Sequence, residues 1–195
     1  TVEKILFIEE YPIEMVTHIR KDWPELTSIL NKAIAVLQQD DLPRIINKWF
    51  GKYPRLSTTT RVSLTLEEQA WLEQNHTVRV WIADYPPYQI IKSNEALEGI
   101  SIEHLKLIEK RTGIRFKYEI TDQMFVDFLE SMKQGKGPDM TALIVPTPER
   151  QQYLYFTEPY LSSPYVIFIR EEDNPIFDIQ GLVGKTLAVP PCVPY

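Results

Sequence analysis

Two loops carry the residue types best suited to binding a small molecule. The first is a Tyr-Pro-Pro-Tyr sequence in which Tyr85 and Tyr88 flank two prolines. Aromatic rings on a stiff backbone line small-molecule pockets at little entropic cost. The second contains Thr147 and Arg150. The planar guanidinium of an arginine can hold a carboxylate through two parallel hydrogen bonds, and the threonine adds a hydroxyl.

Each loop also has a purely structural interpretation. A Tyr-Pro-Pro-Tyr sequence is also typical of a packed turn, and a single arginine after a proline also serves as a surface or helix-capping residue. Position favours binding, because ligands of open α/β sheets bind outside the carboxyl ends of the strands. Both loops follow predicted strands, at 78–82 and 139–145.

The other reactive side chains do not assemble into a catalytic, metal or cofactor site. Three histidines, His18, His76 and His104, lie far apart and lack the spacing of metal ligands. The single cysteine, Cys192, has no neighbouring base, and the sequence contains no phosphate-binding glycine loop or nucleophile elbow. We therefore predict that this segment is not an enzyme and holds no metal and no cofactor.

Composition excludes several classes of protein. The 195 residues are 44% hydrophobic and 25% charged, as in soluble globular proteins, and the length predicts one domain or slightly more. No apolar run approaches the roughly 18 residues that a membrane-spanning helix needs. The formal net charge of −6 gives no basic surface for phosphates, so nucleic acid is excluded as a partner.

Hydrophobic periodicity predicts a mainly helical first part of the chain. Strands are expected at 5–8 and 15–19, and helices over 22–37, 41–50 and 65–75. The apolar face of the first helix is formed by Leu26, Ile29, Leu30, Ala33 and Leu37, and that of the second by Leu42, Ile45, Ile46, Trp49 and Phe50.

The rest of the chain alternates strand and helix. The predicted elements are 78–82, 101–112, 114–120, 121–134 and 139–145, followed by strands at 166–169 and 186–189. This β-α-β-α-β order specifies parallel strands with right-handed helical crossovers. The predicted helix N-caps are Asp22, Thr65, Ser101 and Thr121.

The second part of the chain resembles the family 3 extracellular solute-binding proteins, which fold as two-lobed Venus flytraps. The matching stretches are 78–88, 99–105, 137–140, 147–150, 156–160 and 184–189. The resemblance implies an α/β fold: a type II periplasmic-binding-protein-like lobe, with an open sheet flanked by helices and a helical N-terminal segment. It also implies that Tyr85 or Tyr88 stacks on a ligand, and that Arg150 clamps its carboxylate.

One departure from the family pattern leaves the ligand open. Amino-acid binders of this family usually present small hydroxyl residues just before the arginine loop. This chain has an apolar run at 142–145 and only Thr147 after it. A flytrap that binds another molecule, or that works without a ligand, is therefore a further interpretation.

The first fifty residues resemble the closing strand and helices of a flytrap, and 65–72 resembles a connector. We predict the end of one flytrap at 1–52, a linker and connecting helix at 53–75, the first lobe of a second flytrap at 76–175 and the start of its second lobe at 176–195. No signal peptide is recognisable at the N-terminus of the sequence. We expect this because the segment is read as an excerpt of a longer chain. We expect the helix pair at 22–51 to pack on the lobe at 76–170.

Flytraps in tandem resemble the periplasmic part of BvgS-like hybrid sensor histidine kinases. The resemblance implies a periplasmic ligand-sensing domain of an inner-membrane protein, which signals by lobe closure on a small molecule such as an amino acid or another carboxylate. The resemblance implies that other parts of the parent chain anchor it in the membrane. It is also compatible with a parent protein that forms a homodimer. The alternatives are a transport-linked solute-binding protein, or the sensory input of another membrane-bound enzyme.

Overall fold

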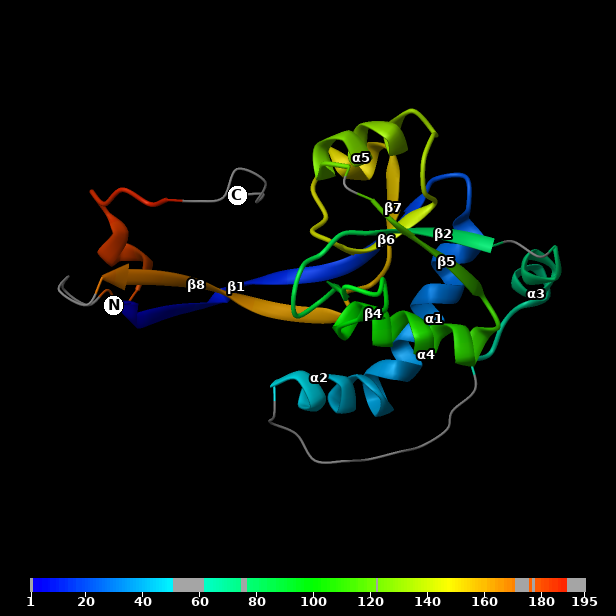
Figure 1. Ribbon diagram of the computed structural model, residues 1–195, viewed down its shortest axis with the longest axis horizontal. Coiled ribbons are helices and arrows are strands. Elements are labelled where there is room, and N and C mark those ends of the chain that lie inside the picture. The colour runs from blue at the N-terminus through cyan, green and yellow to red at the C-terminus, as the bar shows by residue number, and fades with distance from the viewer. Residues whose placement is uncertain are drawn as a thin grey trace.

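The computed structural model describes residues 2–50, 62–74, 77–121, 123–170, 176 and 178–188. It is an α/β lobe with a long two-stranded ribbon projecting from it (Figure 1). The helices are α1 Pro24–Asp40, α2 Leu42–Phe50, α3 Leu66–Glu73, α4 Ile100–Thr112 and α5 Phe125–Lys133. The strands are β1 Val2–Arg20, β2 Thr77–Ile82, β3 Ile90–Ile91, β4 Leu97–Glu98, β5 Arg115–Ile120, β6 Met140–Ile144, β7 Leu154–Phe156 and β8 Leu161–Arg170. Two short 3-10 turns are η1 Arg150–Gln152 and η2 Ile179–Leu182.

The predicted parallel unit is confirmed. Strand β2 lies between β5 and β6 and pairs with both in parallel, while α4 and α5 provide the two crossovers. The full sheet has the order β5-β2-β6-β1-β7, and β8 pairs with β1. The sheet is mixed, because β1 runs antiparallel to β6, β7 and β8. The predicted fold class, an open sheet flanked by helices, is thus confirmed.

The predicted strand segments at 5–8 and 15–19 are confirmed as strand, but they are not separate strands, because both belong to the single 19-residue strand β1. Its outer part pairs with β8, and its inner end enters the sheet between β6 and β7. The ladder with β8 shifts register between Ile8 and Ile13. Pro12 lies in that interval and has no N–H to donate to a ladder, so the local pattern looks like a strand break.

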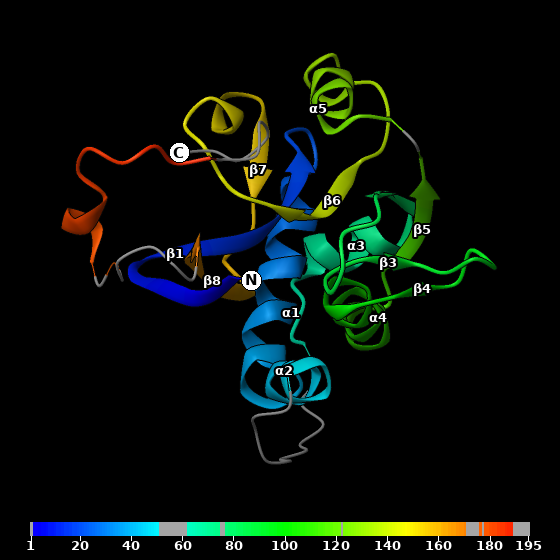
Figure 2. The same ribbon diagram turned by 60° about the vertical axis from the view of Figure 1, so that its left-hand side comes forward.

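The two faces of the sheet are covered by different helices (Figure 2). On one face, the largest apolar cluster joins α1, α3 and α4 to β2 and β6. On the other face, a smaller cluster joins Phe128 and Met132 of α5 to Trp81 of β2. Alternation along β2 explains the division, since Val78 and Val80 belong to the first cluster and Trp81 to the second.

The helix pair at the start of the chain packs on the lobe, as expected. Helices α1 and α2 both contact α4. The predicted face of α1 is at most 1% exposed throughout and lies in the same cluster as β2 and α4. Removing a leucine or isoleucine side chain from water contributes about 1.5–3 kcal/mol, so α1 is an integral part of this core. The predicted face of α2 is buried only in part, since Phe50 is 49% exposed.

Polar contacts reinforce this packing. The carboxylate of Glu68 on α3 is buried and accepts hydrogen bonds from Ser28 Oγ at 2.6 Å and Lys32 Nζ at 2.7 Å on α1. Burial opposes the ionised form of Glu68, but these donors outweigh it and lower its pKa. Asp41, at the end of α1, pairs with Arg111 of α4.

Of the four predicted N-caps, only Thr65 is confirmed. Its side chain accepts a hydrogen bond from the Glu68 N–H at 3.2 Å, which forms the expected capping box. Asp22 is instead paired with Arg20, at 2.6 and 2.7 Å, and makes no cap hydrogen bond. Helix α4 begins at Ile100 and helix α5 at Phe125, so Ser101 lies inside its helix and Thr121 four residues before its own.

Two further sequence predictions concern the end of the chain and the domain boundaries. A strand at 186–189 is wrong for residues 186–188, which form no strand; residue 189 lies outside the described residues. The division at 52, 75 and 175 stays a prediction, because residues 51–61, 75–76 and 171–175 also lie outside them. His76 and Cys192 also lie outside the described residues.

In the described part of the chain, no helix has the length and apolar character required to cross a membrane.

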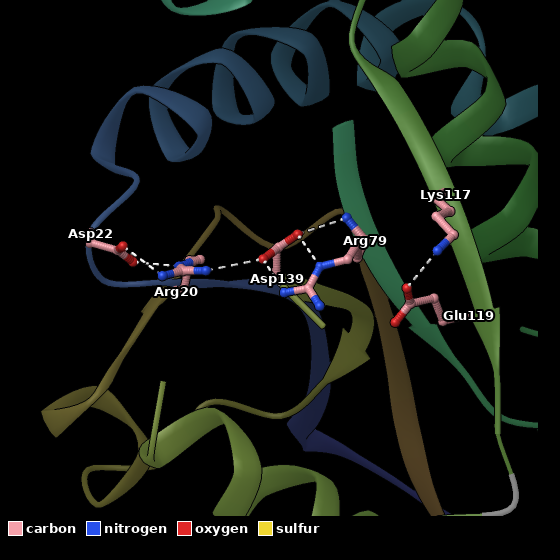
Figure 3. Close-up of polar contacts among 6 residues, drawn as sticks. All are labelled: Arg20, Asp22, Arg79, Lys117, Glu119 and Asp139. Carbon is pink, nitrogen blue, oxygen red and sulfur yellow. Dashed lines mark hydrogen bonds and ion pairs between the residues drawn. The ribbon is translucent and has the colours of Figure 1, made fainter. Parts of the chain in front are cut away.

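A charge network ties β1 into the sheet (Figure 3). The carboxylate of Asp139 is 3% exposed and accepts hydrogen bonds from Arg20 Nη1 at 3.2 Å and from Arg79 Nη2 at 2.9 Å. It also accepts the backbone N–H of Arg79 at 2.9 Å. Asp139 therefore links β1, β2 and the start of β6. Figure 3 also shows an ion pair on β5, in which Lys117 Nζ lies 3.2 Å from Glu119 Oε1. This pair is more exposed to solvent than Asp139.

Candidate ligand-binding site

The two predicted binding loops leave the same edge of the sheet. Strands β2 and β6 are parallel neighbours, with Val80 opposite Met140 and Trp81 opposite Thr141. Their carboxyl ends therefore lie side by side, which is where open α/β sheets bind ligands. Tyr85 and Tyr88 follow β2, and Thr147 and Arg150 follow β6. The hydrogen bonds of Tyr85, Thr147 and Arg150 run within their own loops or to adjacent residues, whereas the Tyr88 carbonyl also accepts the N–H of Ser101 on α4.

The loop after β2 is held in a tight turn. Its peptide bond between Pro86 and Pro87 is cis. The Tyr88 N–H donates to the Tyr85 carbonyl at 2.9 Å, and the two rings are stacked, with centroids 5.7 Å apart and planes at 16°. Tyr85 is 55% exposed, whereas Tyr88 is half-buried against the cluster around Ile100. Tyr88 thus supports the turn, while Tyr85 is the more exposed of the two rings.

Gly99 lets the start of α4 lie directly on this loop. Its φ is +116°, and a Cβ atom at this position would lie 2.3 Å from the Tyr88 carbonyl oxygen. The first N–H groups of α4 donate to loop carbonyls, Ile100 to Pro87 at 3.1 Å and Ser101 to Tyr88 at 3.0 Å. The loop carbonyls therefore cap the helix, which gives the two tyrosines a rigid base.

The loop after β6 is organised around Arg150. Its N–H donates to Thr147 Oγ1 at 3.3 Å, so the threonine hydroxyl already has a structural role. Its guanidinium donates from Nη1 to the Val145 carbonyl at 2.7 Å and lies over the Phe125 ring of α5, 5.4 Å from the centroid. The side chain is half-buried, and burial lowers its pKa against the opposing effect of Tyr153 and Glu149. An incompletely solvated arginine of this kind attracts a carboxylate more strongly than a surface one.

Three buried polar residues near these loops were not predicted as binding residues from the sequence. Gln89 accepts the Ala83 N–H at 3.2 Å, but its Nε2 has no partner among the described residues. The indole Nε1 of Trp81 and both ring nitrogens of His18 are also unpaired there. His18 stands out in the sequence only as a polar residue in an apolar strand, a weak signal without knowledge of its neighbours.

Comparisons with known proteins show similarity to solute-binding and sensor proteins. Residues 78–188, more than half of the chain, match the model of "Bacterial extracellular solute-binding proteins, family 3". The virulence sensor protein BvgS of Bordetella pertussis is 24% identical over 88% of this chain, and the chain spans 14% of its length. The arginine-binding extracellular protein ArtP of Bacillus subtilis is 27% identical over 55% of this chain and 40% of its own.

Further similarity is found in another sensor and in a solved structure. The sensor protein EvgS of Escherichia coli K12 is 23% identical over 78% of this chain, which spans 13% of its length. A crystal structure of the B. pertussis BvgS periplasmic domain superposes with a TM-score of 0.46 at 25% identity, covering 51% of this chain and 19% of that one. With its family model matched over more than half its length, the chain belongs to the family 3 bacterial extracellular solute-binding proteins.

Proposed function

We propose that this chain is the periplasmic ligand-sensing part of a membrane-bound two-component sensor kinase, and that it binds a small molecule carrying a carboxylate, such as an amino acid. One observation carries the sensor assignment. The similarity to BvgS extends over 88% of the chain, whereas the similarity to the solute-binding protein ArtP covers 55%. The sensor relatives thus match beyond the family region at 78–188.

The proposed binding groups are Tyr85, Tyr88, Thr147 and Arg150. Arg150 holds the ligand carboxylate, and Tyr85 supplies an exposed ring for stacking. Tyr88 and Thr147 hold the two loops in place through ring stacking and a hydrogen bond to the Arg150 N–H. The segment acts as a binding module rather than a catalyst, and its partners include neither nucleic acid nor a cofactor.

The proposed signal is a shift of population. A ligand that contacts two lobes binds the closed state better than the open state, and it favours closure by that difference in affinity. We infer that this segment corresponds to one lobe of a flytrap, so a ligand would meet only part of its contacts here. We therefore expect the isolated chain to bind carboxylates with at most millimolar affinity.

A titration of this chain with acetate, L-glutamate and L-arginine tests the proposal. We expect weak, saturable chemical-shift changes by nuclear magnetic resonance at the loops after β2 and β6. Arg150→Met abolishes them, and Arg150→Lys weakens them, because lysine keeps the charge but lacks the planar fork. Micromolar affinity for an amino acid would contradict the one-lobe expectation. Binding unaffected by Arg150→Met would remove Arg150 from the site.

The alternatives are a solute-binding protein of a transport system and the sensory input of another membrane-bound enzyme. The sequence that follows Tyr195 in the parent chain separates the three. A second lobe, then an apolar span and a dimerisation helix containing a histidine, is expected for the kinase. A chain that finishes after one flytrap would instead support transport.

A further inference from the structure

Four side chains from four neighbouring strands form a row beneath α5. Trp81 of β2 lies opposite Thr141 of β6, and His18 of β1 lies opposite both Thr141 and Phe156 of β7. Residues opposite each other in paired strands project from the same face of a sheet. Trp81 and His18 both contact the Phe128 ring of α5, with centroids 4.5 and 5.5 Å away. The row therefore faces α5.

His18 is the most unusual member of this row. Its side chain is fully buried, yet neither ring nitrogen has a hydrogen-bond partner in the part of the chain that the structure describes. A neutral imidazole carries one N–H donor and one lone pair, and the great majority of buried polar groups in proteins are paired. The Nε1 donor of Trp81, in the same row, is also unpaired there. Two buried N–H donors beneath α5 are thus left without an acceptor among the described residues.

Arg150 brings a positive charge to the same place. Its guanidinium lies over Phe125 of α5, and Phe125 in turn contacts Trp81 with ring centroids 5.8 Å apart. Burial, and then the charge of Arg150, lower the pKa of His18 to about 3, so the ring is neutral at physiological pH. The charged residues of α5, Asp127, Glu130 and Lys133, are exposed and leave Arg150 as the charge that acts on this ring.

We propose that His18 is a second recognition group for the carboxylate that Arg150 holds, and therefore a specificity-determining residue of the site. The inference rests on the proposed function. Without a ligand, Arg150 donates to the Val145 carbonyl and His18 is covered. A carboxylate that draws the guanidinium away from that carbonyl gains the imidazole N–H as a further donor. Ligands with two acceptor oxygens are then preferred over ligands with one.

This role gives the N-terminal segment a part in recognition. His18 belongs to β1 and lies outside residues 78–188, the region matched by the family. The site is therefore composite: the family region supplies the tyrosines and Arg150, and the preceding segment supplies the imidazole. A lobe built from the family region alone lacks this donor.

The histidine ring nitrogens of the chain can report this contact directly. We propose to follow them by ¹⁵N nuclear magnetic resonance while acetate or L-arginine is added in millimolar steps. The His18 signals are expected to shift with the same saturation curve as the Arg150 loop. His104 is a matched control, since it is also fully buried and unpaired among the described residues but stacks on Tyr160, with centroids 4.3 Å apart. Its signals are expected to stay in place.

Substitution separates recognition from packing. His18→Phe keeps a ring against Phe128 and removes both nitrogens, and it is expected to weaken carboxylate binding about fivefold, the loss of one hydrogen bond. His18→Gln keeps a donor and is expected to recover part of the affinity. His104→Phe is expected to leave binding unchanged. Thermal unfolding of each variant verifies that it is folded.

The possible outcomes distinguish the inference from the function on which it rests. If Arg150→Met abolishes binding while His18→Phe leaves the affinity unchanged and the His18 signals do not move, His18 is a core residue only. The inference then fails and the proposed carboxylate site stands. If neither acetate nor L-arginine binds in a manner that depends on Arg150, the proposed site fails and the inference fails with it.

Discussion

The sheet of this lobe has one face under α1, α3 and α4 and the other under α5, and the two faces differ in composition. Among the described residues, the first carries a cluster of sixteen buried apolar residues and the second a cluster of four. The smaller cluster adjoins Arg150, His18 and the unpaired indole of Trp81. Polar groups that contribute little to stability are characteristic of functional sites. We therefore expect the first face to contribute most to the stability of the lobe, whereas Arg150 and His18, which we propose as ligand-binding groups, adjoin the second face.

The largest expected effect lies on the first face. Leu30 of α1 is 0% exposed, and Leu30→Ala is expected to lower the free energy of unfolding by about 2–5 kcal/mol, because it leaves a cavity in the main core. Urea denaturation followed by circular dichroism measures the loss. Leu66→Ala, at a 79% exposed position of α3, is the control and should change stability by less than about 0.5 kcal/mol. Equal stability of both variants would mean that α1 does not pack on the lobe.

The charge network at Asp139 is expected to rank next. Asp139→Ala leaves Arg20 and Arg79 without their buried carboxylate and should cost about 2–3 kcal/mol, less than for a fully buried pair because both arginines are partly exposed. The matched control is Lys117→Ala in the solvent-exposed pair with Glu119, with an expected cost below about 0.5 kcal/mol. A small loss at Asp139 would show that β1 is held in the sheet by apolar packing alone.

The pH dependence of stability compares one histidine from each face. Burial lowers the pKa of His104 to about 3, and burial and Arg150 do the same for His18, from an ordinary value of 6.5. Between these values the unfolded chain binds protons that the folded chain does not, so stability falls as the pH falls below 6.5. From pH 7.5 to 5.5, each histidine is expected to remove about 1.4 kcal/mol.

Urea denaturation at the two pH values measures this loss. His18→Phe and His104→Phe should each remove half of it, since each removes one titrating group. Stability that does not change over this range would show that the rings are not held neutral in the fold. The two variants are expected to differ in ligand binding. His18→Phe should weaken carboxylate binding, and His104→Phe should leave it unchanged.

Local patterns predicted the helices well and their starts poorly. The apolar face of α1 could be predicted because residues three and four apart share one side of a helix. The predicted N-cap at Asp22 does not form, because Arg20, two residues away, donates hydrogen bonds to both of its carboxylate oxygens. Only the Thr65 cap is confirmed, and its partner Glu68 is a neighbour in the same helix.

Long-range pairing explains what the sequence could not reveal about the site. The strand-end rule predicted that the loops with Tyr85 and Arg150 leave one edge of the sheet, because it needs only the order of strands and helices. His18 gave no such signal. It lies opposite Thr141 only because β1 enters the sheet antiparallel beside β6, and no local pattern encodes a pairing between residues so far apart in the chain.

The smallest expected effect separates the two tyrosines of the loop after β2. Tyr88 is half-buried against Ile100, and Tyr88→Ala is expected to lower the free energy of unfolding by about 1–2 kcal/mol. Tyr85 is 55% exposed, so Tyr85→Ala should change stability by less than about 0.5 kcal/mol.

In the acetate and L-arginine titrations, the order of the two variants is expected to reverse. Tyr85→Ala should weaken L-arginine binding more than Tyr88→Ala does, in a folded protein. Tyr85→Phe is the control and should bind as the parent does, because stacking uses the ring and not the hydroxyl. If Tyr85→Ala binds L-arginine unchanged, the exposed ring is not part of the site, and the loop is the packed turn that its sequence also allows.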